Sequence, residues 1–296
     1  MIGRLGDREI QTLPAGEACF AATVDVEDWF HTNYRSAPPV DPDRLPRRVE
    51  ASMDRVLEAF AAAGTRGTFF VLGCVARDHP RLVARIASSG HEIACHGMTH
   101  TLIYEQEARA FGEAVSDARR LLQDQSGQGV LGFRAPSWSL TLRSLWAFDT
   151  LAEAGFRYDS SVFPAGNYLY GIHGAPRALY QLATTAGPLV EAPPAALALG
   201  PWRIGVGGGF YLRALPLWVH RRAMRDYARA GSPFLLYLHP RELDPEAWPL
   251  RLRLSFGEGL IHDWAIAGVP RRIARLLSSR RWEPLGDILR RRGLLS

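Results

Sequence analysis

Short apolar runs alternate with longer amphipathic stretches along most of the chain. The runs are almost continuously apolar, as is typical of parallel strands buried on both faces. The stretches between them repeat apolar residues at helical spacing, and the stretch over 48–63 ends at Gly64. The pattern predicts strands over 19–24, 67–72, 91–95, 130–133 and 233–238, and helices over 48–63, 80–88, 105–123, 142–154, 216–230 and 269–278.

The alternation of strands and helices implies a parallel sheet with covering helices. It is interrupted between 163 and 209, where a region rich in glycine, proline and alanine predicts loops and short strands. No linker-like stretch divides the chain, and 296 residues with 47% apolar content can bury one large core. We therefore expect a single domain over 19–292, preceded by an N-terminal extension over 1–18.

Ionisable side chains gather where the predicted strands end. Asp25, Glu27 and Asp28 follow the first strand, and carboxylates there are costly unless a cation or a proton neutralises them. His96 and His100 follow the third strand, at a spacing that lets two imidazoles share a metal ion. Two histidine nitrogens and one carboxylate oxygen form the open ligand set of a catalytic zinc, so the sequence predicts a divalent metal site.

Two further strand ends supply candidates for acid–base chemistry. Hydrolysis needs a base that takes a proton from water and an acid that returns one to the leaving group. Asp25 is the candidate base, because a metal ion and Arg134, at the end of another strand, would favour its charged form. His239 is the candidate acid, because an imidazolium can protonate a departing amine near neutral pH.

The composition indicates which classes of partner molecule we expect the protein to bind. All 35 basic residues are arginine, and the formal net charge is +5. No nucleic-acid-binding motif accompanies the late arginine clusters, so we predict no nucleic-acid partner. No apolar run is long enough for a membrane span, 1–17 lacks an apolar signal core, and the three cysteines lie in apolar settings. These features predict a cytoplasmic protein without an integral membrane segment.

The order of these motifs resembles that of the NodB-homology polysaccharide deacetylases, carbohydrate esterase family 4. The family's five motifs are matched by Thr23-Val24-Asp25-Val26-Glu27-Asp28, His96-Gly97-Met98-Thr99-His100, Arg134-Ala135-Pro136, Asp159-Ser160-Ser161 and Leu236-Tyr237-Leu238-His239. Two departures are Gly97, where serine or threonine is commoner, and Arg241, where an aromatic residue is commoner. The resemblance implies an α/β fold, a distorted (β/α) barrel with fewer than eight regular units and a loop-rich insertion.

The family's residue roles carry over by motif. The resemblance makes Asp25 the catalytic base, His96 and His100 metal ligands, Arg134 the residue that orients the base, and His239 the general acid. It implies one divalent metal ion as cofactor, with zinc expected.

The sequence leaves two candidates for the third metal ligand, Glu27 and Asp28. The reason is that Val26 separates acids that are often adjacent in the family. Glu27 shares a strand face with Asp25 by period-two alternation, whereas Asp28 needs a bend to reach the metal. Motif residues and nearby aromatic side chains supply the predicted substrate-binding set, namely Pro136, Trp138 and Asp159.

The resemblance implies a hydrolase of linear amides that removes N-acetyl groups from N-acetylhexosamine units of an oligo- or polysaccharide. Segments 25–30, 158–164 and 207–211 resemble in particular the subgroup of exosortase (PEP-CTERM) exopolysaccharide loci, with a subgroup-specific region over about 160–292. Two alternatives are a catalytically silent carbohydrate-binding relative and an allantoinase-like hydrolase of small amides on the same scaffold.

Overall fold

The computed structural model describes residues 2–38, 41, 44–166, 169–200, 202–250 and 252–295. Its main sheet has ten strands in the order β1-β2-β8-β9-β7-β6-β5-β4-β3-β12, and every pair from β9 to β12 along this order is parallel. Antiparallel β1, β2 and β8 extend the sheet beyond β9. The strands are β1 (Ile2–Leu5), β2 (Arg8–Thr12), β3 (Phe20–Val26), β4 (Thr68–Val71), β5 (Glu92–Cys95), β6 (Gly132–Phe133), β7 (Tyr158–Asp159), β8 (Tyr180–Thr184), β9 (Gly187–Glu191) and β12 (Phe234–Leu238).

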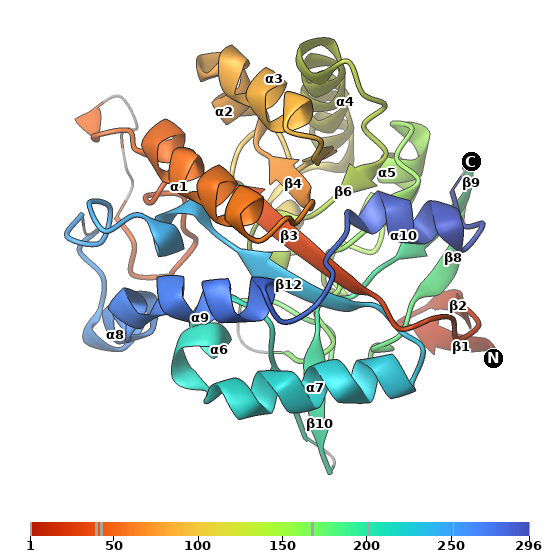
Figure 1. Ribbon diagram of the computed structural model, residues 1–296. Coiled ribbons are helices and arrows are strands. Elements are labelled where there is room, and N and C mark those ends of the chain that lie inside the picture. The colour runs from red at the N-terminus through yellow and green to blue at the C-terminus, as the bar shows by residue number, and fades with distance from the viewer. Residues whose placement is uncertain are drawn as a thin grey trace.

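Helices surround this sheet (Figure 1). In that view α2, α3 and α4 lie above β3, while α6, α7 and α9 lie below β12. No helix in the described part of the chain is long and apolar enough to cross a bilayer. The helices are α1 (Val49–Ala62), α2 (Gly73–Asp78), α3 (Pro80–Ser88), α4 (Ala108–Ser126), α5 (Ala147–Glu153), α6 (Gly209–Ala214), α7 (Leu217–Arg229), α8 (Phe256–Asp263), α9 (Val269–Leu277) and α10 (Leu285–Arg291), and a separate hairpin joins β10 (Ala196–Leu199) to β11 (Trp202–Gly205).

Side-chain alternation along β3 separates two cores. Val24 and Val26 belong to the larger core, which also buries the apolar face of α1, with Met53 and Phe60 at helical spacing. Ala21 faces the opposite way, into a smaller core that α10 closes.

The same alternation carries Asp25 and Glu27 to the inner face that begins with Ala21. Leu285 and Ile288 of α10 fill the other end of this inner core, beneath the strands. The acids therefore lie on this face at the carboxyl end of β3.

The predicted α/β architecture with a mostly parallel sheet is confirmed. The predicted barrel is not confirmed, because β1 and β12 are the two ends of the strand order and no pairing among the described residues joins them. The outer edge of β12 instead meets the segment after β11, where Tyr237 N donates to the Gly207 carbonyl at 2.8 Å and Gly208 forms an isolated bridge.

Most predicted elements form, with some shifts at their ends. Loops and short strands do occupy the glycine- and proline-rich region, as β8 to β11. The helix expected over 142–154 is confined to α5, because Ser144 Oγ accepts a hydrogen bond from Thr141 N and donates to the Ser139 carbonyl, which favours turns before the helix. Sequence periodicity did not reveal β1, β2, α6, α8 or α10.

Candidate active site

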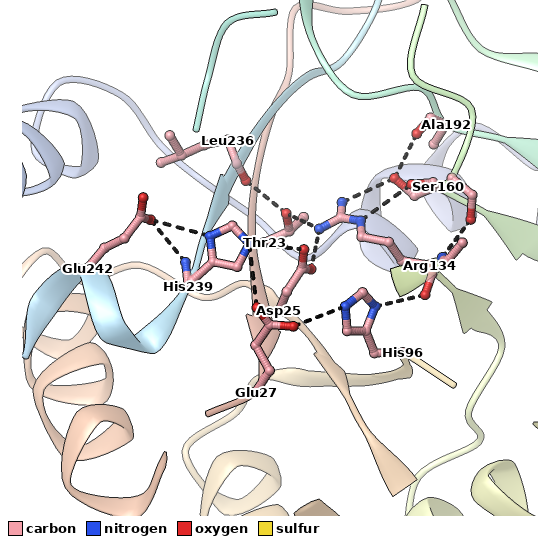
Figure 2. A network of polar contacts seen from close by, with 12 residues as sticks. Thr23, Asp25, Glu27, His96, Arg134, Ser160, Ala192, Leu236, His239 and Glu242 are labelled. Atoms are coloured by element: carbon pink, nitrogen blue, oxygen red, sulfur yellow. Dashed lines mark hydrogen bonds and ion pairs between the residues drawn. The ribbon is translucent and has the colours of Figure 1, made fainter. Parts of the chain in front are cut away.

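Asp25 is paired with Arg134, as the sequence predicts. Arg134 Nη1 donates to Asp25 Oδ1 at 2.7 Å and to Thr23 Oγ1 at 2.9 Å (Figure 2). The Arg134 side chain is fully buried, and its guanidinium carbon lies 4.0 Å from the ring centroid of Phe70. A buried cation needs a nearby anion, so this ion pair holds both side chains in place.

Glu27, His96 and His100 bring three potential ligand atoms within 4.8 Å of one another. Glu27 Oε2 lies 2.9 Å from His100 Nε2 and 3.6 Å from His96 Nε2. Burial disfavours charge on Glu27, but His100 and then His96 outweigh burial and hold its pKa well below the usual value. The carboxylate is therefore ionised at neutral pH.

The polar atoms of this cluster fit a bound cation. His96 Nδ1 lies 2.8 Å from the Arg134 carbonyl oxygen, which can only accept a hydrogen bond, so Nδ1 donates to it and Nε2 is the ring nitrogen that faces Glu27. Glu27 Oε2 and His100 Nδ1 are buried and form no well-shaped hydrogen bond with any described residue. Two imidazoles and one carboxylate are a suitable ligand set for a divalent ion.

The turn between the two histidines explains one departure from the family pattern. Gly97 has a φ of +91°, in the left-handed region that favours glycine. A Cβ at this position would lie 3.2 Å from the Thr99 carbonyl oxygen. Glycine thus allows the turn that returns His100 to His96, where their ring centroids are 5.7 Å apart.

Asp28, the alternative third ligand, does not join the cluster. Its Oδ2 accepts hydrogen bonds from Arg48 N at 2.8 Å and Val49 N at 3.1 Å, at the start of α1. Its Oδ1 accepts one from Trp29 N at 2.9 Å. Because β3 ends at Val26, Asp28 is turned off the inner face and caps α1 instead.

We expect Asp28→Ala to lower the free energy of unfolding by about 1–3 kcal/mol, because backbone N–H groups at the start of α1 lose their acceptor. Chemical denaturation would measure this loss. The variant should retain metal in elemental analysis, whereas Glu27→Ala, the neighbouring control, should lose it. The reverse pattern would make Asp28 the ligand.

His239 follows β12, with its side chain 31% exposed. Its Nε2 lies 4.0 Å from Asp25 Oδ2 and 3.9 Å from Glu27 Oε1 (Figure 2). Glu242 Oε2 accepts a hydrogen bond from His239 N at 3.0 Å and lies 3.7 Å from Nδ1. Burial alone would lower the pKa of His239, but Glu242, Glu27 and Asp25 outweigh burial and raise it to about 9. The imidazole is therefore protonated at neutral pH, as a general acid must be.

His31 packs against the cluster of potential metal ligands. Its Nδ1 accepts a hydrogen bond from Asp28 N at 2.9 Å, and its ring stacks on His100 with centroids 5.9 Å apart. Burial, followed by the proximity of His100, lowers the pKa of His31 to about 4. A neutral His31 therefore packs against His100 without adding charge.

The three predicted substrate-binding residues lie in different settings in the structure. Trp138 lines the cavity at the site, whereas Pro136 is buried and does not. Asp159 is fully buried, and its Oδ1 accepts a hydrogen bond from Ser161 Oγ at 2.5 Å. Ser161 Oγ in turn accepts one from Ala135 N at 2.7 Å. Asp159 thus supports the backbone behind the site and is out of reach of a substrate in the cavity.

One cavity of about 340 Å³ joins these side chains. Trp138 and Tyr237 form part of its wall, with ring centroids 5.1 Å apart. Lining residues that sequence analysis missed include Tyr34, Tyr170, Arg213, Glu242 and His262. Glu242 could have been found from its position three residues after His239, the spacing of a capping box. The others follow no strand and no recognisable motif.

Family models match two adjoining parts of the chain. Residues 43–158 match the polysaccharide deacetylase family, and residues 160–290 match a domain of unknown function, DUF3473. The first match includes His96 and Arg134, the second includes His239, and Asp25 and Glu27 precede both.

Curated relatives carry deacetylase names. A chitooligosaccharide deacetylase from Sinorhizobium fredii is 33% identical over 100 residues, which cover 33% of this chain and 44% of the relative. A peptidoglycan deacetylase from Helicobacter pylori is 26% identical over 151 residues, which cover 50% of each protein. The chain thus spans half or less of these relatives.

Solved structures share the fold. A Mycobacterium smegmatis protein classed with the polysaccharide deacetylases aligns with a TM-score of 0.63 at 24% identity, covering 97% of each chain. An allantoinase aligns with a TM-score of 0.59 at 18% identity, covering 92% of this chain and 89% of its own. At these identities the likeness concerns the fold alone.

Proposed function

We propose that the protein is a metal-dependent hydrolase that removes N-acetyl groups from N-acetylhexosamine units of a polysaccharide. The observation that carries the proposal is one cavity that holds the Glu27–His96–His100 cluster beside both Asp25 and His239. The deacetylase relatives support an acetylated sugar as the substrate.

Each side chain has a separate role in the proposed reaction. A divalent ion held by Glu27, His96 and His100 would polarise the acetamide carbonyl and acidify a water molecule. Asp25 Oδ2 accepts the proton of the attacking water, since Oδ1 is occupied by Arg134. His239 donates its proton to the amide nitrogen as the C–N bond breaks, which releases acetate and a free amine.

Further features of the proposal follow from the sequence. Zinc is the proposed metal, because two histidines and a carboxylate with an open position are its common catalytic ligand set.

The proposed substrate is a bacterial exopolysaccharide, and the proposed location is the cytoplasm. We also propose a single catalytic domain, since β3, before both family matches, pairs with β12 in the second.

Metal removal tests the proposal most directly. We expect the protein to release acetate from an N-acetylglucosamine hexamer, to lose this activity after chelation and to regain it with added zinc. Acetate and free amine should appear in equal amounts. Allantoin serves as the control substrate: turnover of allantoin without acetate release would favour the small-amide hydrolase, and no turnover with no bound metal would favour the silent binder.

A further inference from the structure

The apolar face of α8 is turned outward. A surface helix normally packs its apolar stripe against the core, but no residue of α8 is buried. Phe256 and Leu260, about one turn apart, are 89% and 46% exposed, and Trp264, directly after the helix, is 50% exposed. Four of the eight large apolar side chains that are exposed in the described part of the chain lie within 256–264. Single exposed apolar residues are common, whereas a group of them indicates an interaction site.

Polar contacts hold α8 in this position. Near its start, Glu258 Oε1 accepts a hydrogen bond from Arg35 N at 3.1 Å, and Glu258 Oε2 accepts one from Ser36 N at 3.0 Å. At its end, Arg213 Nη2 donates to the Ile261 carbonyl at 2.8 Å. These contacts fix the helix without burial of its apolar face, so that face is available to a ligand.

The exposed face of α8 lines a groove with a volume of about 400 Å³. Leu252 and Leu254, in the segment before the helix, also line it. The groove lies beside the catalytic cavity, because His262 lines both, while the preceding residue, Ile261, lines the cavity alone. A ligand chain that leaves the cavity across α8 would therefore enter the groove.

The size of the catalytic cavity indicates what occupies the groove. A volume of about 340 Å³ is near the lower end of the range for small-ligand pockets, so a polysaccharide cannot lie wholly inside the cavity. The remaining sugar units of a bound chain must lie on the surface around it. The groove adjoins the cavity and can hold such units.

The lining of the groove suits a sugar ring. A pyranose presents an apolar face of C–H groups and a rim of hydroxyl groups. Phe256 and Trp264 supply aromatic rings for the apolar face, and Ser255 and Asp263 carry oxygen atoms that can accept hydrogen bonds from hydroxyl groups. An anionic membrane surface is a poorer match, because the described residues that line the groove include a carboxylate and no arginine.

We propose that the groove on α8 binds sugar units of the substrate that lie beyond the catalytic cavity. The preferred substrate is then a long chain, in which one unit is deacetylated while others occupy the groove. This inference rests on the proposed deacetylase function. Because α8 lies within 160–290, it also gives a role to part of the domain of unknown function.

Chain length provides the first test. For the intact protein loaded with zinc, acetate release would be measured on the dimer and the hexamer of N-acetylglucosamine. We expect kcat/KM per acetyl group to be at least about tenfold higher for the hexamer, as for two aromatic contacts of ordinary strength. Equal values would overturn the inference.

Alanine variants assign the length preference to the groove. Phe256→Ala combined with Trp264→Ala should reduce the hexamer-to-dimer ratio about tenfold, a readout that cancels any general loss of activity. Both side chains are at least half exposed, so the fold should survive. Trp202→Ala is the matched control, because Trp202 is 73% exposed but lines neither the groove nor the cavity. An unchanged ratio in the double variant, or an equal fall in Trp202→Ala, would overturn the inference.

A binding measurement separates this inference from the proposed function. Calorimetry with the Asp25→Asn variant, which should bind glycan without turnover, would report the affinity for dimer and hexamer. Tighter binding of the hexamer that the two alanine substitutions abolish, with no acetate released by the wild-type protein, would support the groove and refute the deacetylase. Acetate release with equal affinity for both lengths would do the opposite.

Vesicle binding tests the alternative occupant of the groove. The protein would be sedimented with vesicles of phosphatidylcholine and phosphatidylglycerol, and we expect it to remain in the supernatant. Sedimentation that Phe256→Ala abolishes, together with a hexamer-to-dimer ratio of one, would assign the groove to a lipid surface and overturn the inference.

Discussion

Replacing both His96 and His100 by alanine is expected to abolish metal binding and acetate release together. Glu27 would remain as the sole member of the cluster, and one carboxylate cannot hold a catalytic divalent ion against water. Elemental analysis and the acetate assay on the same preparation would measure both losses.

The fold should survive this double substitution, because neither His96 nor His100 belongs to the two main apolar cores. Circular dichroism and the unfolding midpoint would verify that survival. His173→Ala is the matched control, since His173 is exposed, and it should retain metal and activity. Stoichiometric metal and normal turnover in the double variant would show that the metal lies elsewhere.

Period-two alternation was sufficient to predict which of the two acids after β3 lies on the face of Asp25. Glu27 shares the inner face with Asp25, and the structure places Glu27, and not Asp28, beside the histidines. The pairing of Arg134 with Asp25 was also predictable, because an acid at a buried strand end requires a cation. Local chemistry and strand period therefore predicted the centre of the site.

The cavity wall was not predictable in the same way. Arg213 and His262 come from α6 and α8, which have only six and eight residues, too short for helical periodicity to reveal. Asp159 matched a family motif, but only the hydrogen bonds through Ser161 show that it supports the backbone from behind. Where side chains are brought together by tertiary packing between distant segments, the sequence pattern carries no signal of their proximity.

The second large expected effect is on catalysis by the acid–base pair, Asp25 and His239. Asp25→Asn keeps the shape and an oxygen for Arg134 but removes the basic carboxylate, so kcat should fall by about 10²–10⁴ while metal stays bound. Some stability should also be lost, because the Arg134 charge is left without its anion. Assays at temperatures below the unfolding transition would isolate the effect on the chemical step. The control variant is Asp124→Asn, on the exposed surface of α4, which should keep full activity. An Asp25→Asn variant that retains full activity would exclude Asp25 as the base.

His239→Ala tests the other half of the pair through the leaving group. The phenolate of an aryl acetate leaves as a stable anion and needs little help from an acid, whereas the amine of a deacetylated sugar must be protonated as it departs. The variant should therefore lose far more activity on an N-acetylglucosamine oligomer than on an aryl acetate. Glu242→Gln, which removes the negative charge beside His239 Nδ1, should show the same selectivity in milder form, since the imidazolium would be less stabilised. Equal losses on ester and amide would mean that His239 positions other groups and donates no proton.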